Sequence, residues 1–492
     1  MSGWHTAMTS PLMPSASNMR LRSSALTLAL AGGIDYGLQL VVPFFLVRFL
    51  DPSVFGQYRF LWLMAGTALA IAPAFMPQAL FYFLPRAEPA NKGLLVGNVL
   101  VYLAAAACVV GAVTLGWNPL LPVMAENLFF QTHSISTIFL ALWVVASLFD
   151  VLPTAEERTH WHARAMIALS VCRTLLLAGV AMVTSEVLWV VSAMLAVAVV
   201  KIVLLAYYMH SRRQKTSWQL AGIKMQLAYC LHFALCNTFL LLRLQADQWV
   251  VASMLLPAQY AVFSIAAAVL PVAPLISRPV INAMMPDLNR VQSRGDFTAV
   301  SQLIAKTNGA IALFLLPISG GLFAVTPELV DIVYTSQYRD AAPIMRVYLI
   351  GMMMAAFAVG YVLPALERGR FAAINSAVSL VLSIVLSIVG INQFGMVGAA
   401  LGSVLTMAIS EFWSMQVVSR MLGIKMSELL AWKKLRSTLV ATAMAMIGVL
   451  LLGELVSGKS FPMLVVKGLA YVVLFAACFF PMWRMPESNI TD

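Results

Sequence analysis

Val151-Leu152-Pro153-Thr154-Ala155-Glu156-Glu157-Arg158 recurs as Val362-Leu363-Pro364-Ala365-Leu366-Glu367-Arg368, an offset of 211 residues between positions 151 and 362. A second pair, Gly56-Gln57-Tyr58 and Ala258-Gln259-Tyr260, is offset by 202 residues between positions 56 and 258. These recurrences predict two equivalent halves. Alternating access is usually built from paired repeats, so two halves in an apolar chain favour a moving transporter over an enzyme. Chance recurrence of Pro and Tyr in this biased composition is the alternative.

The composition is that of a membrane protein. Hydrophobic residues make up 61% of the chain and charged residues 10%, against roughly 45–50% and about 25% in soluble domains. A chain of 492 residues can hold about fourteen segments at the usual length of about 20 apolar residues per span. No stretch is long and polar enough to form a separate soluble domain.

The net charge of +11 would suggest nucleic acid as the partner of a soluble protein, but here membrane topology accounts for it. If the amino terminus lies inside and the spans alternate, most of the 31 Lys and Arg residues fall on the cytoplasmic side. Cytoplasmic loops of membrane proteins are enriched in these residues. We therefore expect both termini in the cytoplasm and no nucleic-acid partner. The apolar run that ends at Leu50 has no small-residue cleavage site and is expected to be the first span.

We predict an all-α polytopic membrane protein with about fourteen transmembrane helices, arranged as two pseudo-symmetric six-helix lobes and two C-terminal helices. The predicted spans are 24–47, 57–80, 93–115, 134–153, 164–184, 187–209, 226–246, 249–275, 303–325, 342–365, 371–391, 395–418, 437–456 and 462–483. The predicted regions are a cytoplasmic tail (1–23), an N-terminal lobe (24–210), a linker (211–225), a C-terminal lobe (226–418), a linker (419–436), two additional helices (437–483) and a cytoplasmic tail (484–492).

The largest inner connection, Ser277–Gln302, contains apolar residues at helical spacing between charges. These residues are Val280, Ile281, Met284, Leu288 and Val291. The pattern predicts an amphipathic segment that lies at the cytoplasmic membrane interface. The alternative is that these residues are the ends of the two flanking helices.

Arg173 is the first candidate for substrate binding. It follows Arg164 by nine residues, so at 1.5 Å per residue it lies roughly 14 Å deeper, near the middle of the hydrocarbon layer. Intramembrane arginines usually mark a substrate or ion path, and a guanidinium suits phosphate oxygens because its donors form a planar fork. A structural ion pair with Asp35 or Glu411 is the alternative. Asp35 itself could take up a proton or sodium, or it could neutralise Arg173. The Gly33-x3-Gly37 pattern around it would allow another helix to approach closely.

The predicted span 226–246 carries polar residues along one face, among them His232, Cys236 and Arg243, with Asp247 just beyond its end. A polar face in lipid is costly, so this face should contact protein or a water-filled cavity. We therefore include Arg243 among the substrate-binding candidates and Asp247 among those for ion coupling or charge balance. The alternative is an Arg243–Asp247 pair at the outer interface. Lys201 is expected to extend its amine toward the inner interface, and we give it a secondary role.

Other chemistry finds no support in the sequence. It contains no Gly-rich phosphate loop, nucleophile elbow or His-Glu-x-x-His motif. The five cysteines lie in apolar stretches without paired spacing, which argues against a disulfide framework or a zinc cluster. We expect no cofactor, no metal site and no catalytic residue.

Several segments resemble those of bacterial polysaccharide and O-antigen flippases in the multidrug, oligosaccharidyl-lipid and polysaccharide exporter superfamily. Arg48–Tyr58 resembles the first outer loop of these proteins, and Met285–Leu288 resembles their connection between helices 8 and 9. Tyr338–Pro343 resembles the passage from helix 9 to helix 10. Glu367–Arg370 and Gly395–Ala400 resemble the helix 10 to helix 12 signature. The likeness spans roughly residues 24–418, and the order of the motifs carries it; Asp51 departs from the glycine common at that position.

This resemblance implies two six-helix lobes around a central cavity, two extra helices, and movement of undecaprenyl-pyrophosphate-linked oligosaccharides across the inner membrane. The family has no invariant catalytic motif. Our hypothesis is that Arg173, helped by Arg243 and Arg48, attracts the anionic pyrophosphate or acidic sugars, while Asp35 and Asp247 balance charge or couple an ion gradient. The expected partners are the lipid-linked oligosaccharide, membrane lipids and the polysaccharide polymerase machinery.

Two other functions are weighed against this one. A proton- or sodium-coupled multidrug exporter of the same superfamily should have a cavity dominated by carboxylates, and the intramembrane cation Arg173 argues against it. An integral membrane glycan polymerase would need room outside the membrane for its acceptor, and the predicted outer loops are short. The neighbouring genes would discriminate, because glycosyltransferases and a polymerase would favour the flippase.

Overall fold

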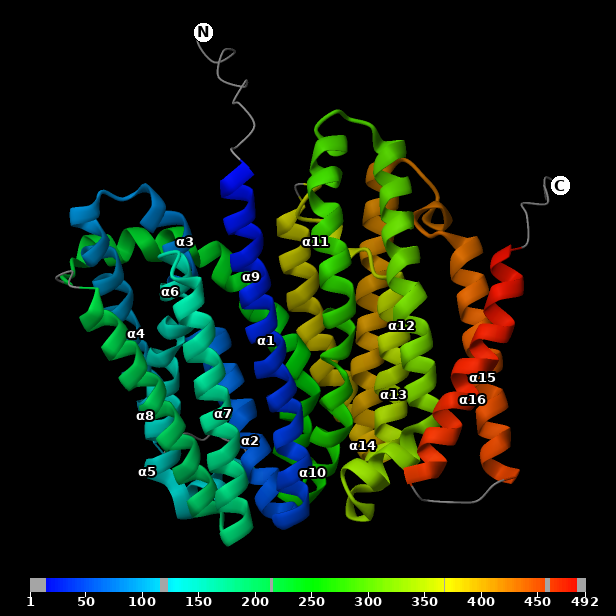
Figure 1. Ribbon diagram of the computed structural model, residues 1–492, viewed down its shortest axis with the longest axis horizontal. Helices are drawn as coiled ribbons and strands as arrows, with labels where there is room; N and C mark the ends of the chain where they lie inside the picture. The colour runs from blue at the N-terminus through cyan, green and yellow to red at the C-terminus, as the bar shows by residue number, and fades with distance from the viewer. Residues whose placement is uncertain (1–14, 116–122, 213–215, 367, 456–460, 485–492) are drawn as a thin grey trace, which may run out of the picture. The chain divides into compact units, whose positions relative to one another are not determined.

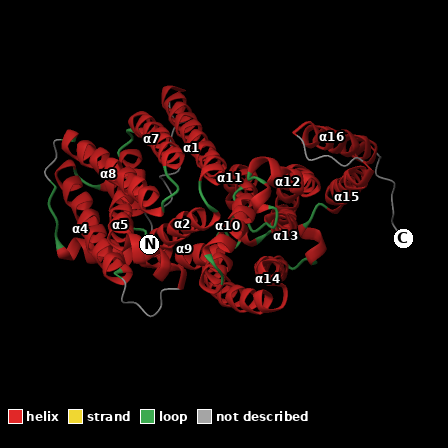
Figure 2. Ribbon diagram, turned by 90° about the horizontal axis from the view of Figure 1, so that it is seen from below, coloured by secondary structure: helices red, strands yellow, loops and turns green. Residues whose placement is uncertain are grey.

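The computed structural model describes residues 15–115, 123–212, 216–366, 368–455 and 461–484, and every regular element in these ranges is a helix (Figure 2). Among these described residues, ten helices are long and apolar enough to cross a membrane, or twelve if each of two bent pairs forms one span. The prediction of an all-α, multi-pass membrane protein is therefore confirmed. The count of fourteen spans stays a prediction.

The chain divides into two compact units. Unit 1 comprises residues 1–49, 72–115 and 132–231, and unit 2 comprises residues 50–71, 116–131 and 232–492. The long helix α9 (Leu220–Met254) belongs to unit 1 up to Leu231 and to unit 2 from residue 232 onward.

Unit 1 is a bundle of membrane-length helices coloured blue to green in Figure 1. Its helices are α1 (Ser15–Phe49), α3 (Met76–Phe83), α4 (Lys92–Thr114), most of α5 (Val123–Ala146), the single turn α6 (Leu152–Ala155), α7 (Thr159–Val183), α8 (Val187–Ser211) and the first part of α9. Its core is formed by fully buried apolar side chains such as Val96, Phe139, Phe149 and Val191.

Unit 2 contains the larger bundle, coloured green to red in Figure 1, together with the early helix α2. Its helices are α2 (Pro52–Ile71), the rest of α9, α10 (Pro257–Ala266), α11 (Val272–Gln292), α12 (Phe297–Val333), α13 (Ala341–Met354), α14 (Gly369–Leu422), α15 (Trp432–Leu455) and α16 (Phe461–Arg484). Its core includes Phe60, Phe263, Leu315 and Leu349.

Helix α2 is fixed to α9 and α10 within unit 2. A Cβ atom added to Gly56 would lie 1.9 Å from the carbonyl oxygen of Pro257, so only glycine allows this approach. Further along α2, Thr67 Oγ1 donates to Gln245 Oε1 at 2.9 Å and accepts from Trp249 Nε1 at 2.8 Å. The predicted lobes follow chain order, whereas this packing groups α2 with residues 232–492.

Helix α14 is a hairpin of two antiparallel helices. Its 54 residues turn at Gly395, which has a φ of 60°. The two arms touch at Gly390 and Gly398, because a Cβ on Gly390 would lie 2.2 Å from the Gly398 carbonyl oxygen. Closer to the open end, Asn375 Nδ2 donates to the Ser410 carbonyl oxygen at 3.3 Å. Small residues thus let two polypeptide backbones pack directly.

The repeated Val-Leu-Pro sequence builds a similar turn in each unit. In unit 1 the Arg158 amide donates to the Pro153 carbonyl oxygen at 2.8 Å, just before α7 begins. In unit 2 the Arg368 amide donates to the Leu363 carbonyl oxygen at 2.9 Å, just before α14 begins. Glu367 lies outside the described residues. The repeated sequence is therefore accompanied by a repeated local structure.

The prediction of a separate amphipathic segment at the membrane interface is wrong. Helix α11 continues from Val272 to Gln292, and α12 starts at Phe297. Met284 and Leu288 are buried in a cluster with Ile304 of α12 and apolar residues of α14. The alternation of apolar and polar residues reflects packing between neighbouring helix ends.

Candidate functional site

Arg173 and Asp35 form an ion pair inside unit 1, between helices α7 and α1, which lie side by side in Figures 1 and 2. Arg173 Nη2 lies 3.0 Å from Asp35 Oδ1. Ser170 Oγ donates to the same carboxylate oxygen, and Gln39 Nε2 donates to Asp35 Oδ2 at 2.7 Å. Of the two partners that the sequence left open for Arg173, the structure selects Asp35 rather than Glu411.

The spacing of these residues along their helices explains the cluster. Ser170 and Arg173 are three residues apart in α7, and Asp35 and Gln39 are four apart in α1, so each pair lies on one helix face. The expected close helix contact at Gly33-x3-Gly37 is wrong, because a Cβ atom on either glycine would meet no atom within 4 Å. The polar cluster is held by hydrogen bonds instead.

The pair is accessible despite its position within the spans. The Arg173 side chain keeps 11% of its surface exposed and the Asp35 side chain 23%. A guanidinium carries five N–H donors, and Asp35 is the one partner found for Arg173 among the residues that the structure describes. The cation can therefore receive a second oxyanion while Asp35 stays in place.

Unit 2 holds a second buried cluster around Glu411 in the second arm of α14. The carboxylate oxygen Oε2 accepts from the amides of Val359 and Gly360 at 3.2 and 3.3 Å. Arg243 of α9 lies within electrostatic range of Glu411 but outside ion-pair distance, and its Nε atom is buried without a hydrogen-bond partner. Beside them, Tyr361 Oη donates to Asn308 Oδ1 at 3.0 Å.

The amides that bind Glu411 are available because the helix is broken there. After α13, the chain forms a short 3-10 turn to Phe357, is extended at Ala358, and resumes at Gly360. Such a break frees N–H groups that a continuous helix would consume. The sequence predicted an unbroken span over 342–365, and this is wrong because a carboxylate about 50 residues later in the chain stabilises the break.

Asp247 is fully enclosed in unit 2 and does not pair with Arg243. Its side chain is 1% exposed. It accepts from Tyr348 Oη at 2.6 Å and from the Gln248 amide at 2.8 Å. The alternative of an Arg243–Asp247 pair is wrong, because the carboxylate points into the protein toward α13. The side chains of His232 and Cys236 lie outside the described residues.

Arg48 does not lie next to Arg173. It is exposed at the end of α1 and donates to the Phe44 carbonyl oxygen of its own helix. It follows Asp35 by 13 residues, or roughly 20 Å along a helix. Arg48 therefore does not belong to the cluster around Arg173.

Two buried lysines have partners that the sequence did not reveal. Lys201 of α8 donates to Asp150 Oδ2 at 2.8 Å and lies 4.6 Å from the centre of the Trp143 ring. The expectation that its amine extends toward the inner interface stays a prediction. Lys467 of α16 pairs with Glu328 of α12. A lysine five residues inside a predicted span needs a partner, and that signal could have found the second pair.

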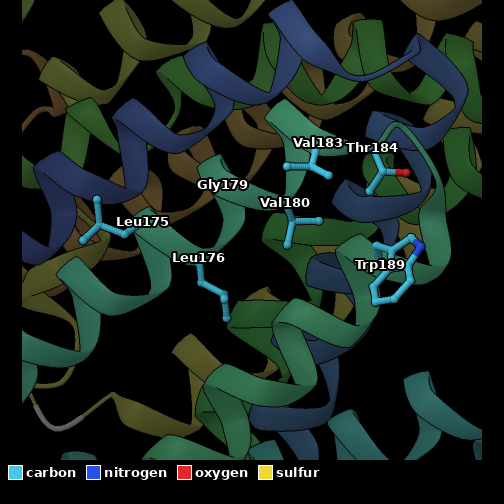
Figure 3. A pocket seen from close by; sticks show the side chains of 7 residues that line it. All are labelled: Leu175, Leu176, Gly179, Val180, Val183, Thr184 and Trp189. Carbon is cyan, nitrogen blue, oxygen red and sulfur yellow. The ribbon is translucent and has the colours of Figure 1, made fainter.

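The apolar hollow between α7 and α8 is not a polar binding site. It has a volume of about 490 Å³, and Figure 3 shows its lining. The lining residues are Leu175, Leu176, Gly179, Val180, Val183, Thr184 and Trp189. None of them carries a charge, so the hollow has nothing with which to orient an anionic group.

A family model described as "Polysaccharide biosynthesis protein" matches residues 45–343, more than half of the chain. The chain belongs to this family. The match runs from the end of α1 to the start of α13 and includes Arg173 and Arg243. The predicted resemblance to polysaccharide flippases of the exporter superfamily is confirmed.

A curated relative of this chain is the probable low-salt glycan biosynthesis flippase Agl15 of Haloferax volcanii. The two are 25% identical over 199 residues, which cover 39% of this chain and 42% of the relative. The chain thus matches less than half the length of that relative.

Solved structures show the same fold. The lipid II flippase MurJ in an inward closed conformation superposes with a TM-score of 0.73 at 11% identity, covering 93% of this chain and 99% of MurJ. An inward-facing multidrug resistance MATE family transporter of the MOP superfamily gives 0.60 at 13% identity, covering 78% and 95%. The chain therefore shares its fold with these membrane transporters.

Proposed function

We propose that this polysaccharide biosynthesis protein is a flippase that moves undecaprenyl-pyrophosphate-linked oligosaccharides across the bacterial inner membrane by alternating access. The observation that carries the proposal is the accessible Arg173–Asp35 pair at mid-span depth in unit 1. A cation at this depth is costly and is usually retained for a substrate or ion path. The family match and the glycan flippase relative support a lipid-linked glycan as cargo.

Arg173 is suited to the pyrophosphate because its planar donors match two phosphate oxygens at once. In the empty protein Asp35 compensates the buried cation, since an unpaired buried charge is strongly destabilising. When the substrate enters, its phosphate binds the donors that Asp35 leaves free. Ser170 and Gln39 keep the carboxylate in place during this exchange.

Arg243 and Glu411 supply a second charged site, in unit 2. Arg243 has a buried donor without a partner, so a passing oxyanion would satisfy it. Glu411 and Asp35 balance the two arginines, or take up a coupling ion, while the enclosed Asp247 serves the packing of unit 2.

The orientation follows from the charge bias of the sequence. With both termini in the cytoplasm, the glycan would be loaded inside and released outside, for O-antigen, surface polysaccharide or exopolysaccharide synthesis. The polymerase that consumes the glycan would then be the partner on the outer side.

A multidrug exporter is the second candidate, favoured by the MATE-like fold and by the two carboxylates Asp35 and Glu411 within membrane-length helices. A cationic drug would bind the carboxylates and be repelled by Arg173. Exchange of Arg173 for a neutral residue should therefore impair glycan transport but leave or improve drug export.

The experiment uses proteoliposomes that contain a fluorescent undecaprenyl-pyrophosphate oligosaccharide and a membrane-impermeant quencher. Wild-type protein should make the inner-leaflet probe accessible, and Arg173→Gln should slow this exchange. Loss of a hydrogen bond to a charged group costs about 1.5–3 kcal/mol, or roughly 10- to 150-fold. Lys306→Gln, at an exposed position of α12, is the matched control. Undiminished exchange by Arg173→Gln would contradict the role of Arg173, and ethidium export without glycan exchange by the wild type would contradict the flippase.

A further inference from the structure

A polar cavity lies at one end of unit 1, separate from the Arg173–Asp35 site. Its volume is about 310 Å³. Three cations, Lys92, Arg158 and Arg212, line it together with Glu156 and Glu157. The lining comes from the start of α4, the turn before α7 and the end of α8, so the cavity sits where membrane spans begin and end.

One of the two carboxylates in the cavity is already neutralised. Glu156 forms an ion pair with Arg212, accepts from Arg212 Nε at 3.0 Å and accepts from Tyr208 Oη at 2.6 Å. Arg212 and Glu156 therefore hold each other in place in the cavity lining, and together they carry no net charge. The remaining lining charges are Lys92 and Arg158 against the exposed Glu157.

The two remaining cations stand at helix N-termini, where anions are normally favoured. Lys92 is the first residue of the 23-residue helix α4, and Arg158 is the residue before the 25-residue helix α7. Neither helix has an acidic residue in its first turn. The positive ends of two helix dipoles thus add to two cationic side chains in the same cavity.

Lys92 also lacks a counter-ion. It is half-buried, and the described residues give it no hydrogen-bond or ion-pair partner. Arg158 is held in position by its guanidinium, which lies 5.6 Å from the centre of the Tyr208 ring. An unpaired, half-buried ammonium beside a positioned guanidinium is the arrangement that binds a phosphate oxyanion.

We propose that this cavity binds the phosphate of an anionic phospholipid headgroup. Its place at the ends of membrane spans puts it at headgroup depth, and basic pockets at that depth recognise anionic lipids. The acyl chains would remain in the bilayer along unit 1. This site is independent of the substrate pathway and does not rest on the proposed flippase activity.

The test measures lipid retention by native mass spectrometry of the full chain from nanodiscs that contain phosphatidylcholine alone or with phosphatidylglycerol. Wild-type protein should retain one phosphatidylglycerol in preference to phosphatidylcholine, and Lys92→Gln should weaken that retention about tenfold. Lys224→Gln, an exposed lysine of α9 outside the cavity, should retain lipid as the wild type does. Thermal unfolding in phosphatidylcholine alone should be the same for all three proteins, because Lys92 forms no bond in the lipid-free protein.

Inorganic phosphate separates the possible sources of the anion. If the headgroup is the ligand, phosphate should compete only at high concentration and should fail to bind Lys92→Gln. Tight, saturable phosphate binding with no preference between the two lipids would overturn the lipid assignment. Equal phosphatidylglycerol retention by wild type and Lys92→Gln would overturn the site itself.

Discussion

The hairpin of α7 and α8 in unit 1 and the hairpin of α14 in unit 2 differ in how closely their arms pack. Gly179 of α7 and Gly390 of α14 are separated by 211 residues, the offset of the repeated Val-Leu-Pro sequence. A Cβ atom on Gly390 would lie 2.2 Å from the Gly398 carbonyl oxygen, whereas one on Gly179 would meet nothing within 4 Å. Gly390 thus allows a tight contact between helices in unit 2, whereas the matching Gly179 borders an open space in unit 1.

The residues that match across the repeat differ in size. The 211-residue offset that pairs Gly390 with Gly179 also pairs Gly398 with Val187 and Ala400 with Trp189. Gly179 and Trp189 both line the hollow shown in Figure 3. The tightly packed hairpin therefore has small residues at positions where the open hairpin has larger ones.

The charged side chains Lys201 in unit 1 and Glu411 in unit 2 show a second difference between the halves. Lys201 and Glu411 are 210 residues apart by number, between the offsets of the two sequence echoes. Lys201 donates to the Asp150 side chain at the end of a span, and Glu411 accepts from two backbone amides at the break after α13. The two side chains carry opposite charges and bind different kinds of partner, so the two halves differ in the chemistry of these charges.

The largest effect on stability should come from Glu411→Ala. The change leaves the Val359 and Gly360 amides without an acceptor, at about 1–3 kcal/mol for each buried group, and it removes the charge that compensates Arg243. Thermal unfolding in detergent should show a large loss of stability. Glu411→Gln keeps an acceptor oxygen and should lose much less.

Lys201→Ala is the matched change in unit 1 and should cost less than Glu411→Ala. The Asp150 side chain is 51% exposed and can be hydrated once Lys201 is absent. A loss of stability in Lys201→Ala equal to that in Glu411→Ala would mean that the two breaks are held in the same way, against the comparison.

Gly398→Ala should have the next largest effect. The new methyl group would lie 1.9 Å from the Gly390 carbonyl oxygen, so the arms of α14 must separate. Overpacking of this kind costs about 1–3 kcal/mol. The melting temperature of the purified protein measures the effect, and an unchanged value would show that the arms of α14 are not in contact.

Gly179→Ala should have the smallest effect, and of opposite sign. The position is open, so a methyl group meets no atom. Replacing glycine by alanine within a helix stabilises by roughly 0.5–1 kcal/mol. A melting temperature below that of the wild type would indicate that α8 packs on Gly179 as closely as the arms of α14 do on each other.

Apolar segments and the repeated turn were predictable because they depend on local sequence. The Val-Leu-Pro stretches precede α7 and α14 as expected, and the apolar runs become helices. The break after α13 could not be found this way, since the residue that stabilises it is distant in the chain. The packing of α2 with α9 and α10 likewise depends on Gly56 and Thr67 meeting partners about 180 to 200 residues away.

The candidate site was predictable where a charge had few possible partners. Arg173 lies within a span and needed a carboxylate, and Asp35 was one of two available. The position of Asp247 was not predictable from helix spacing, because its partner Tyr348 belongs to another helix. The sequence did not reveal the phosphate-binding cavity, because its lining residues Lys92 and Arg158 are far apart in the chain. Each of them, taken alone, is an ordinary cation at a membrane interface.

The central claim is that Arg173 binds the pyrophosphate of the substrate, and equilibrium binding tests it most directly. Native mass spectrometry would compare undecaprenyl pyrophosphate with uncharged undecaprenol, on the wild type and on Arg173→Gln. We predict that the wild type prefers the pyrophosphate and that Arg173→Gln loses at least about tenfold of this preference, while its binding of undecaprenol is unchanged. An equal preference for the pyrophosphate in both proteins would contradict the account.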